Sequence, residues 1–225
     1  MTRRWIEFCF LYLVVPAFLA LLPWLSAQTG RNLKVHIIPT LIVMALATLF
    51  VLRRDKNFDF DELGCGRVRT VPRKAWGIML ARFACGAAIL TVALFRINPD
   101  EILYFPKRNP KFWLIVMCCY PLFSVLAQGV IYRALYWSRY SRLFPKKYKV
   151  VAGAAVFAFA HLPYANVYAL AFPFFGGLMF LSTYRRTRSL MFASIEHALY
   201  GDFLFTIGWG SFFFHKGMMA GGAGG

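Results

Sequence analysis

The sequence has few acidic residues and little charge overall. Only 9 of its 225 residues are Asp or Glu, against 26 Lys and Arg, and charged residues make up 16% of the chain. Hydrophobic residues make up 60%, and the mean hydropathy is +0.56. A water-soluble domain of this size carries more charge and a smaller apolar fraction. The composition therefore predicts an integral membrane protein.

The scarcity of acid leaves a formal net charge of +17, which raises nucleic acid as a possible partner. The basic residues, however, cluster between the apolar segments, as they do beside anionic lipid headgroups. We therefore expect contacts with anionic lipids at the basic loops and no nucleic-acid binding.

Cysteine patterns with a defined use are also missing. The five cysteines, Cys9, Cys65, Cys85, Cys118 and Cys119, are odd in number and include no C-x-x-C pair. Neither a disulfide framework nor a zinc ribbon is therefore indicated. We expect buried, reduced thiols with a structural role.

Seven apolar runs reach or approach the roughly 20 residues that a helix needs to cross a bilayer. They cover residues 6–25, 35–52, 75–95, 112–138, 150–164, 168–184 and 189–208. The first follows two arginines as a signal peptide would, but its length and two prolines favour a retained helix. The runs predict an all-α, polytopic transmembrane helix bundle of about seven spans. It forms one domain, 1–217, with a motif-bearing core at about 112–214 and a disordered Gly-rich tail at 218–225.

Basic residues are distributed unequally between the two sides of such a bundle. With a cytoplasmic N-terminus, 17 of the 26 Lys and Arg lie on the cytoplasmic side and seven lie on the other side. The positive-inside rule therefore favours N-terminus in and C-terminus out.

The informative residues of these runs are polar ones at membrane depth, where a charged group is costly unless it is paired or hydrated. They are Arg82, Gln128, Arg133, His161, Glu196, His197 and Asp202. Arg82 lies near the start of its run, so we expect its side chain to snorkel to the interface.

Arg133 has two interpretations. It is close to the basic loop that begins at Arg139, so snorkelling is one of them. The other is a polar cavity shared with Gln128 and the two histidines. The helical neighbour that faces Arg133, four residues earlier, is Gly129, so no acid stands where a partner is expected.

Both histidines have polar neighbours. His161 precedes Pro163, which interrupts helical hydrogen bonding, so that free carbonyls and the Asn166 amide are expected to line a wet pocket. His197 stands between two acids, but Glu196 is rotated about 100° from it and Asp202 about 140°, so neither acid shares its helical face.

Two chemistries use such residues. A zinc site needs three or four ligands at fixed geometry, and the sequence has no H-E-x-x-H, so we expect no metal and no other cofactor. Hydrolysis by activated water needs a carboxylate base, together with His or Asn donors to the oxyanion. The donors are present, and the base has to be found.

Three motifs, in chain order, resemble a known family. They are Q-G-V-I-Y-R at 128–133, F-A-F-A-H at 157–161 and E-H-A-L-Y-G-D at 196–202. They are similar to the E-E-x-x-x-R, F-x-x-x-H and H-x-x-x-N motifs of the CAAX protease and bacteriocin-processing family of glutamic intramembrane endopeptidases. The resemblance covers about 121–214. It implies hydrolysis of a peptide bond in a membrane-associated substrate, such as a prenylated or sorting-signal peptide, at a bacterial inner membrane.

The resemblance also implies roles for single residues. Arg133 would orient the catalytic glutamate and pair with its charge, and His161 and His197 would bind the catalytic water or the oxyanion. The family's paired glutamates fall on Gln128 and Gly129, and neither residue is a base.

The polar residues that follow the histidines depart from the family's spacing. Asn166 and Asp202 stand five residues after their histidines rather than four. The helix would therefore have to bend locally for either to join the site.

Three explanations of Gly129 stay open. It is a substitution in an otherwise intact protease, or it marks a non-catalytic protein that binds membrane peptides, or Glu196 or Asp202 has taken over as base and as partner of Arg133. A different class, a small transporter or lipid-binding membrane protein, also fits a polar cavity with broken helices. The sequence shows no halves related by symmetry, which favours the hydrolase over a carrier.

Overall fold

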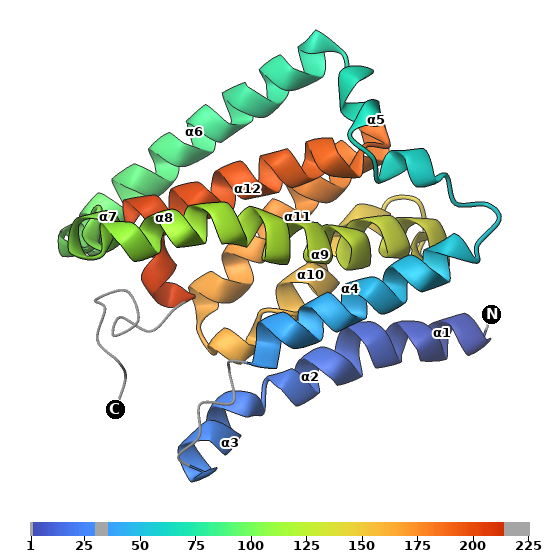
Figure 1. Cartoon of the computed structure of the whole chain (residues 1–225), viewed down its shortest axis with the longest axis horizontal. Helices are drawn as coiled ribbons and strands as arrows, with labels where there is room; N and C mark the ends of the chain where they lie inside the picture. The colour runs from blue at the N-terminus through green and yellow to red at the C-terminus, as the bar shows by residue number, and fades with distance from the viewer. Residues whose placement is uncertain (1, 30–35, 214–225) are drawn as a thin grey trace.

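The computed structural model describes residues 2–29 and 36–213, which form a bundle of helices (Figure 1). The helices are α1 (Thr2–Cys9), α2 (Val15–Leu19), α3 (Leu22–Thr29), α4 (Ile37–Arg53), α5 (Gly66–Arg69), α6 (Arg73–Ile97), α7 (Tyr104–Arg108), α8 (Pro110–Cys119), α9 (Leu126–Gly129), α10 (Lys149–Phe159), α11 (Val167–Thr187) and α12 (Leu190–Ile207). No strand occurs among the described residues, and the predicted all-α bundle is confirmed. The predicted disordered tail, 218–225, and the start of the second apolar run, at 35, lie outside them.

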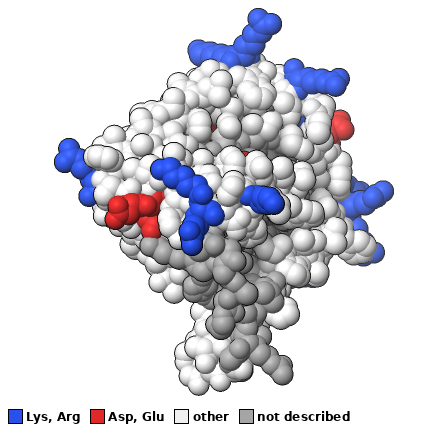
Figure 2. Space-filling view, turned by 60° about the vertical axis from the view of Figure 1, so that its left-hand side comes forward, with Lys and Arg blue, Asp and Glu red and all other residues white. Residues whose placement is uncertain are grey.

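Four helical stretches are long and apolar enough to cross a membrane. They are Thr2–Thr29, Arg73–Ile97, Pro110–Leu143 and Val167–Thr187. Two shorter apolar helices, Ile37–Arg53 and Lys149–Tyr164, together with α12, correspond to the other three predicted runs. Figure 2 shows a face on which most of the surface carries no charged side chain and Lys and Arg stand in small separate groups. These features support an integral membrane protein.

The longest helical stretch, Pro110–Leu143, switches to π-helical winding twice. After α8 comes a π-helical turn, Tyr120–Val125, and after α9 a longer π-helical segment, Val130–Tyr140. Pro121 lacks the N–H that would bond to the carbonyl four residues earlier, which explains why the first π turn begins there. The wider winding changes where side chains point, and Arg133 lies within the second segment.

Segments rich in basic residues meet at one end of the bundle. In Figure 1 the N-terminus and α5 lie at the end opposite α7. At this basic end Arg139 donates to the carboxylate of Glu7 at 2.6 Å. The buried carboxylate of Glu62 accepts hydrogen bonds from Tyr184 at 2.6 Å and from Arg188 at 2.9 Å. These contacts join α1 and the segment after α4 to the ends of the helices that carry the site.

Two glycines let α10 and α11 approach closely. A Cβ built on Gly177 would lie 2.9 Å from the Cα of Ala154, and one built on Gly153 would lie 2.3 Å from a methyl group of Leu181. Real Cβ atoms do not come so close, because cores are close-packed and cannot absorb the overlap. A larger residue at either position would push apart the helices that bear Phe157 and Phe180.

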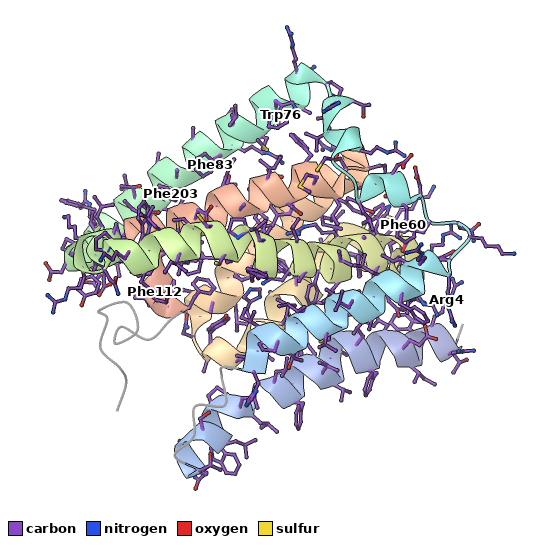
Figure 3. All side chains as sticks on the ribbon, viewed as in Figure 1. Arg4, Phe60, Trp76, Phe83, Phe112 and Phe203 are labelled. Atoms are coloured by element: carbon purple, nitrogen blue, oxygen red, sulfur yellow. The ribbon has the colours of Figure 1, made fainter. Side chains whose placement is uncertain are left out.

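Helix α6 covers one side of α12 through aromatic contacts. In Figure 3 Trp76 and Phe83 lie between the two helices. The Trp76 ring is 4.7 Å from that of Phe192, and the Phe83 ring is 5.9 Å from that of Phe203. Only 11% of the apolar stretch of α6 is buried, so most of this helix faces outward, as a lipid-facing helix does.

The expectation of buried cysteines is wrong. Four of the five are exposed and Cys9 is partly buried; the exposed ones are Cys65, Cys85, Cys118 and Cys119. A free cysteine behaves as a small apolar residue, so three of these thiols fit the apolar outer faces of α6 and α8.

Candidate active site

Arg133 lies inside the protein and does not reach its surface. Only 2% of the residue is exposed. Its guanidinium carbon lies 5.6 Å from the centre of the Phe157 ring and 5.2 Å from that of Phe180, within the range of cation–π contacts. The snorkelling interpretation is therefore wrong, because the head group is enclosed by side chains. The geometry supports the shared polar site.

Arg133, His197 and Tyr120 form a hydrogen-bonded chain, which we call the Arg–His–Tyr chain. Nη2 of Arg133 is 2.9 Å from Nδ1 of His197, and Nε2 of His197 is 3.1 Å from the Tyr120 hydroxyl oxygen. A guanidinium only donates, so Nδ1 accepts and the imidazole proton stands on Nε2, which donates to Tyr120. The Tyr120 O–H is left to donate elsewhere. A cation at one end of such a chain polarises every bond along it.

Gly129 faces two buried polar groups that have no partner. Nη1 of Arg133 and Oγ of Ser194 make no hydrogen bond with any described residue. A Cβ built on Gly129 would lie 3.1 Å from each of these atoms. The backbone here is ordinary helix, with φ −60° and ψ −46°, so it does not require glycine. These two donors lack an acceptor, and a side chain at position 129 is where one would stand.

His161 and His197 lie against the same aromatic ring. The Phe157 ring is 5.1 Å from the His161 ring and 5.5 Å from the His197 ring. Nδ1 of His161 lies 2.9 Å from the Phe157 carbonyl oxygen. Because a carbonyl only accepts, the His161 proton stands on Nδ1 and Nε2 is left as an acceptor. The structure therefore brings both predicted histidines to one site.

Both histidines line an apolar cavity. This larger cavity, of about 650 Å³, lies between α6, α11 and α12 and is also lined by Tyr120 and Phe180. A second cavity of about 290 Å³, lined by Phe112 and other apolar residues of α8, meets it at Tyr120 and His161. Apolar space with a few converging polar groups is typical of a ligand site.

Glu196 is fully buried and pairs with Arg82. Its Oε1 accepts from Nη2 of Arg82 at 2.7 Å, and the same nitrogen donates to the Thr183 hydroxyl at 3.0 Å. The snorkelling expectation for Arg82 is therefore wrong, because its guanidinium turns inward to this carboxylate. Glu196 points to another side of α12 than His197, as helical rotation predicted, and its carboxylate pairs with Arg82 and not with Arg133. The alternative in which Glu196 has become the partner of Arg133 is therefore wrong.

The other three predicted site residues are placed as follows. Gln128 lines the second cavity and donates to the Ser124 hydroxyl at 2.8 Å. Asn166 caps α11, and its Oδ1 accepts from the Ala169 N–H at 2.9 Å. Asp202 has one buried oxygen without a partner. Neither Asn166 nor Asp202 lines the two cavities or bonds to a histidine, so the structure does not bring them into the Arg–His–Tyr chain.

Three residues of the site were not found from the sequence. Tyr120 bonds to His197, Phe180 stacks on the His197 ring at 4.7 Å, and Ser194 faces Gly129. Ser194 stands three residues before His197 and shares its helical face, so spacing alone could have found it. Tyr120 and Phe180 lie on other helices, where no local pattern marks them.

The arrangement provides donors for an oxyanion but no carboxylate beside them. The Tyr120 O–H and the polarising Arg133 suit a carbonyl oxygen that gains negative charge. Among residues 2–29 and 36–213, no group of three or more His, Cys, Asp or Glu side chains is placed to hold a metal ion. What hydrolysis by water still needs is a proton acceptor next to Arg133.

Fold and site together define a polytopic helical membrane protein with a buried polar site beside an apolar cavity. Residues 110–201 match the family described as Type II CAAX prenyl endopeptidase Rce1-like. The resemblance inferred from the motifs is thereby confirmed for this segment, which holds Gly129, Arg133, His161 and His197. Over it, the chain resembles a membrane protease. No curated protein and no solved structure matches the chain.

Proposed function

We propose that this protein is an intramembrane endopeptidase of the CAAX-protease type whose hydrolytic site lacks a carboxylate at position 129. The observation that carries the proposal is the pair of unpartnered donors, Nη1 of Arg133 and Oγ of Ser194, that converge on Gly129. In a complete site these donors would hold a glutamate. The chain as it stands therefore binds its peptide and hydrolyses it slowly or not at all.

The cavities support a prenylated peptide as the substrate class. A CAAX tail carries an isoprenoid chain on its cysteine, and such a chain gains free energy from an apolar cavity. The larger cavity, at about 650 Å³, falls within the range of ligand sites. With the isoprenoid chain in this cavity, the scissile carbonyl would lie near Tyr120 and His161, where the two cavities meet.

Hydrolysis in a completed site would proceed by direct attack of water. A carboxylate at position 129 takes the proton of a water held by His161, and the water oxygen bonds to the carbonyl carbon. Tyr120 donates to the oxyanion, and Arg133 strengthens that donor through His197. The carboxylate then gives its proton to the leaving nitrogen as the C–N bond breaks. Without the carboxylate, the water proton has no acceptor beside Arg133.

Tyr120→Phe tests the role of the Arg–His–Tyr chain. In a Gly129→Glu background we expect this change to lower kcat by roughly 10²-fold, because the hydroxyl meets charge that develops only in the transition state. KM for a prenylated peptide should change by less than about threefold. Tyr200→Phe is the matched control, since Tyr200 lines the same cavity without bonding to His197. Equal losses in the two variants would remove Tyr120 from the mechanism.

Peptide binding tests the proposed function directly. A photoreactive farnesylated CAAX peptide should label the chain saturably in lipid nanodiscs, even with Gly129 in place. Met179→Trp fills part of the larger cavity and should weaken labelling by roughly tenfold or more. Leu122→Trp adds the same bulk at a position that is 61% exposed, and labelling should not change. Equal labelling of both variants, or no saturation, would rule out this cavity as the binding site.

Peptide binding without hydrolysis is a second candidate function, favoured by one observation. A Cβ on Gly129 would lie 3.1–3.2 Å from atoms of Arg133, Ser194 and Leu190, closer than ordinary van der Waals contact. The surrounding side chains thus leave little room for a larger residue at this position. For a dedicated peptide-binding protein, labelling is retained and a glutamate at position 129 restores no cleavage.

A further inference from the structure

A third cavity lies at the basic end of the bundle, apart from the two histidines. It has a volume of about 230 Å³ and is bordered by the start of α6, the end of α11 and the start of α12. Three basic residues line it, Lys74, Arg82 and Arg186, together with hydroxyl-bearing residues that include Ser182 and Thr187. None of the residues that line this cavity is acidic.

The positive charge around this basic cavity is only partly compensated. Arg82 pairs with Glu196 through Nη2, while its buried Nε has no partner. Lys74 and Arg186 are exposed and form no ion pair with any described residue. Several cations around one recess produce a positive potential, which attracts an anion.

The hydrogen-bond donors and the apolar residues that line the basic cavity indicate which kind of anion it would bind. Guanidinium, ammonium and hydroxyl groups suit the several oxygens of a phosphate. Part of the lining is apolar, and includes Ala75, Ile78 and Phe192. Ile78 is 44% exposed and lies on the largely outward-facing α6, so an acyl chain could follow this helix.

We propose that the basic cavity binds the phosphate group of an anionic phospholipid. Lys74 and Arg186 hold the phosphate oxygens near the end of the bundle, and the acyl chains lie along the apolar face of α6. A free phosphate would meet the same donors but would gain nothing from the apolar wall. The proposal assigns one defined site, rather than the diffuse attraction that any basic loop has for anionic lipid. Arg82 lines both the basic and the larger cavity, so the lipid would sit beside the wall of the candidate active site.

Lipid titration of the full chain in an uncharged detergent tests this site. Native mass spectrometry should detect one tight site for short-chain phosphatidylglycerol, with phosphatidylcholine of the same chain length binding roughly tenfold more weakly. Inorganic phosphate should not compete at the concentrations that saturate the lipid. Competition by inorganic phosphate at those concentrations would overturn the lipid assignment and identify a free-phosphate site.

Two double variants of equal charge separate the site from the general surface potential. Lys74→Gln with Arg186→Gln should weaken phosphatidylglycerol binding roughly tenfold or more, because both residues line the basic cavity. Arg73→Gln with Arg185→Gln removes the same charge from exposed neighbours that do not line it, and should cost less than about twofold. All four side chains are exposed, so folding should be retained. Equal weakening by both pairs would overturn the proposal.

Discussion

Replacing Gly129 by Glu is expected to turn this chain into an active intramembrane peptidase. Cleavage of a prenylated CAAX peptide in lipid nanodiscs should rise by roughly 10³-fold or more over the chain as it stands. The reason is that the new carboxylate would accept from Nη1 of Arg133 and Oγ of Ser194, both now without a partner, and would take the proton of the attacking water. The measurement is the initial rate of cleavage of a labelled peptide at saturating concentration.

Position 129 can take the larger side chain at modest cost. The closest atoms belong to the ends of the Arg133, Ser194 and Leu190 side chains, which can shift by a few tenths of an ångström. The backbone at position 129 is helical, and replacing Gly there by a better helix former stabilises the helix by up to about 1 kcal/mol. A buried carboxylate is costly alone, but here it would pair with a buried cation. We therefore expect a folded variant.

Two further variants identify the base. Gly129→Gln has the same size without a basic carboxylate, and it should stay inactive. His161→Ala in the Gly129→Glu background should remove the restored cleavage, because the proposed mechanism has His161 hold the attacking water. If the chain with Gly129 already cleaves as fast as the Glu variant, or if the Gln variant does, the base lies elsewhere. Glu196, Asp202 and His161 itself would then be the residues to replace.

Local helical geometry explains what could be predicted from the sequence. The apolar runs predicted where the long helices lie, because a helix that crosses a bilayer needs a minimum length of apolar sequence. Residues four apart share a helical face, so Gly129 was correctly placed against Arg133. The rotation of about 100° per residue likewise predicted that Glu196 would point away from His197. Each of these inferences needs only the spacing along one helix.

The parts of the site that could not be predicted depend on contacts between helices that are far apart in the sequence. Tyr120 and His197 are 77 residues apart, and Arg82 and Glu196 are 114 apart, so no local spacing marks either pair. The exposed cysteines have a related cause. In a membrane protein the lipid-facing and the buried sides of a helix are both apolar, so hydropathy does not distinguish them. The π-helical segment that carries Arg133 could not be predicted either, because no sequence rule as simple as helical periodicity marks a π-helix.

Replacing Arg133 by Met is expected to have opposite effects on stability with Gly and with Glu at position 129. With Gly129, Arg133 is a buried cation with one hydrogen bond among the described residues, to His197. An apolar side chain of similar length should therefore raise the free energy of unfolding, by about 1–4 kcal/mol. With Glu at position 129, the same change would leave a buried carboxylate without its cation and lower that free energy by about 3–5 kcal/mol.

The difference between these two effects is the coupling energy of residues 129 and 133, which a double-mutant cycle measures. Unfolding by a denaturing detergent in mixed micelles gives the four free energies. Arg82→Met is the control, because Arg82 pairs with Glu196 and should show the same effect in both backgrounds. A coupling below about 1 kcal/mol would contradict the assignment of Arg133 as the partner of residue 129. If the sign does reverse, Arg133 destabilises the chain as it stands, so stability does not explain its presence. The proposed function does explain it, because there Arg133 orients and polarises His197 and Tyr120.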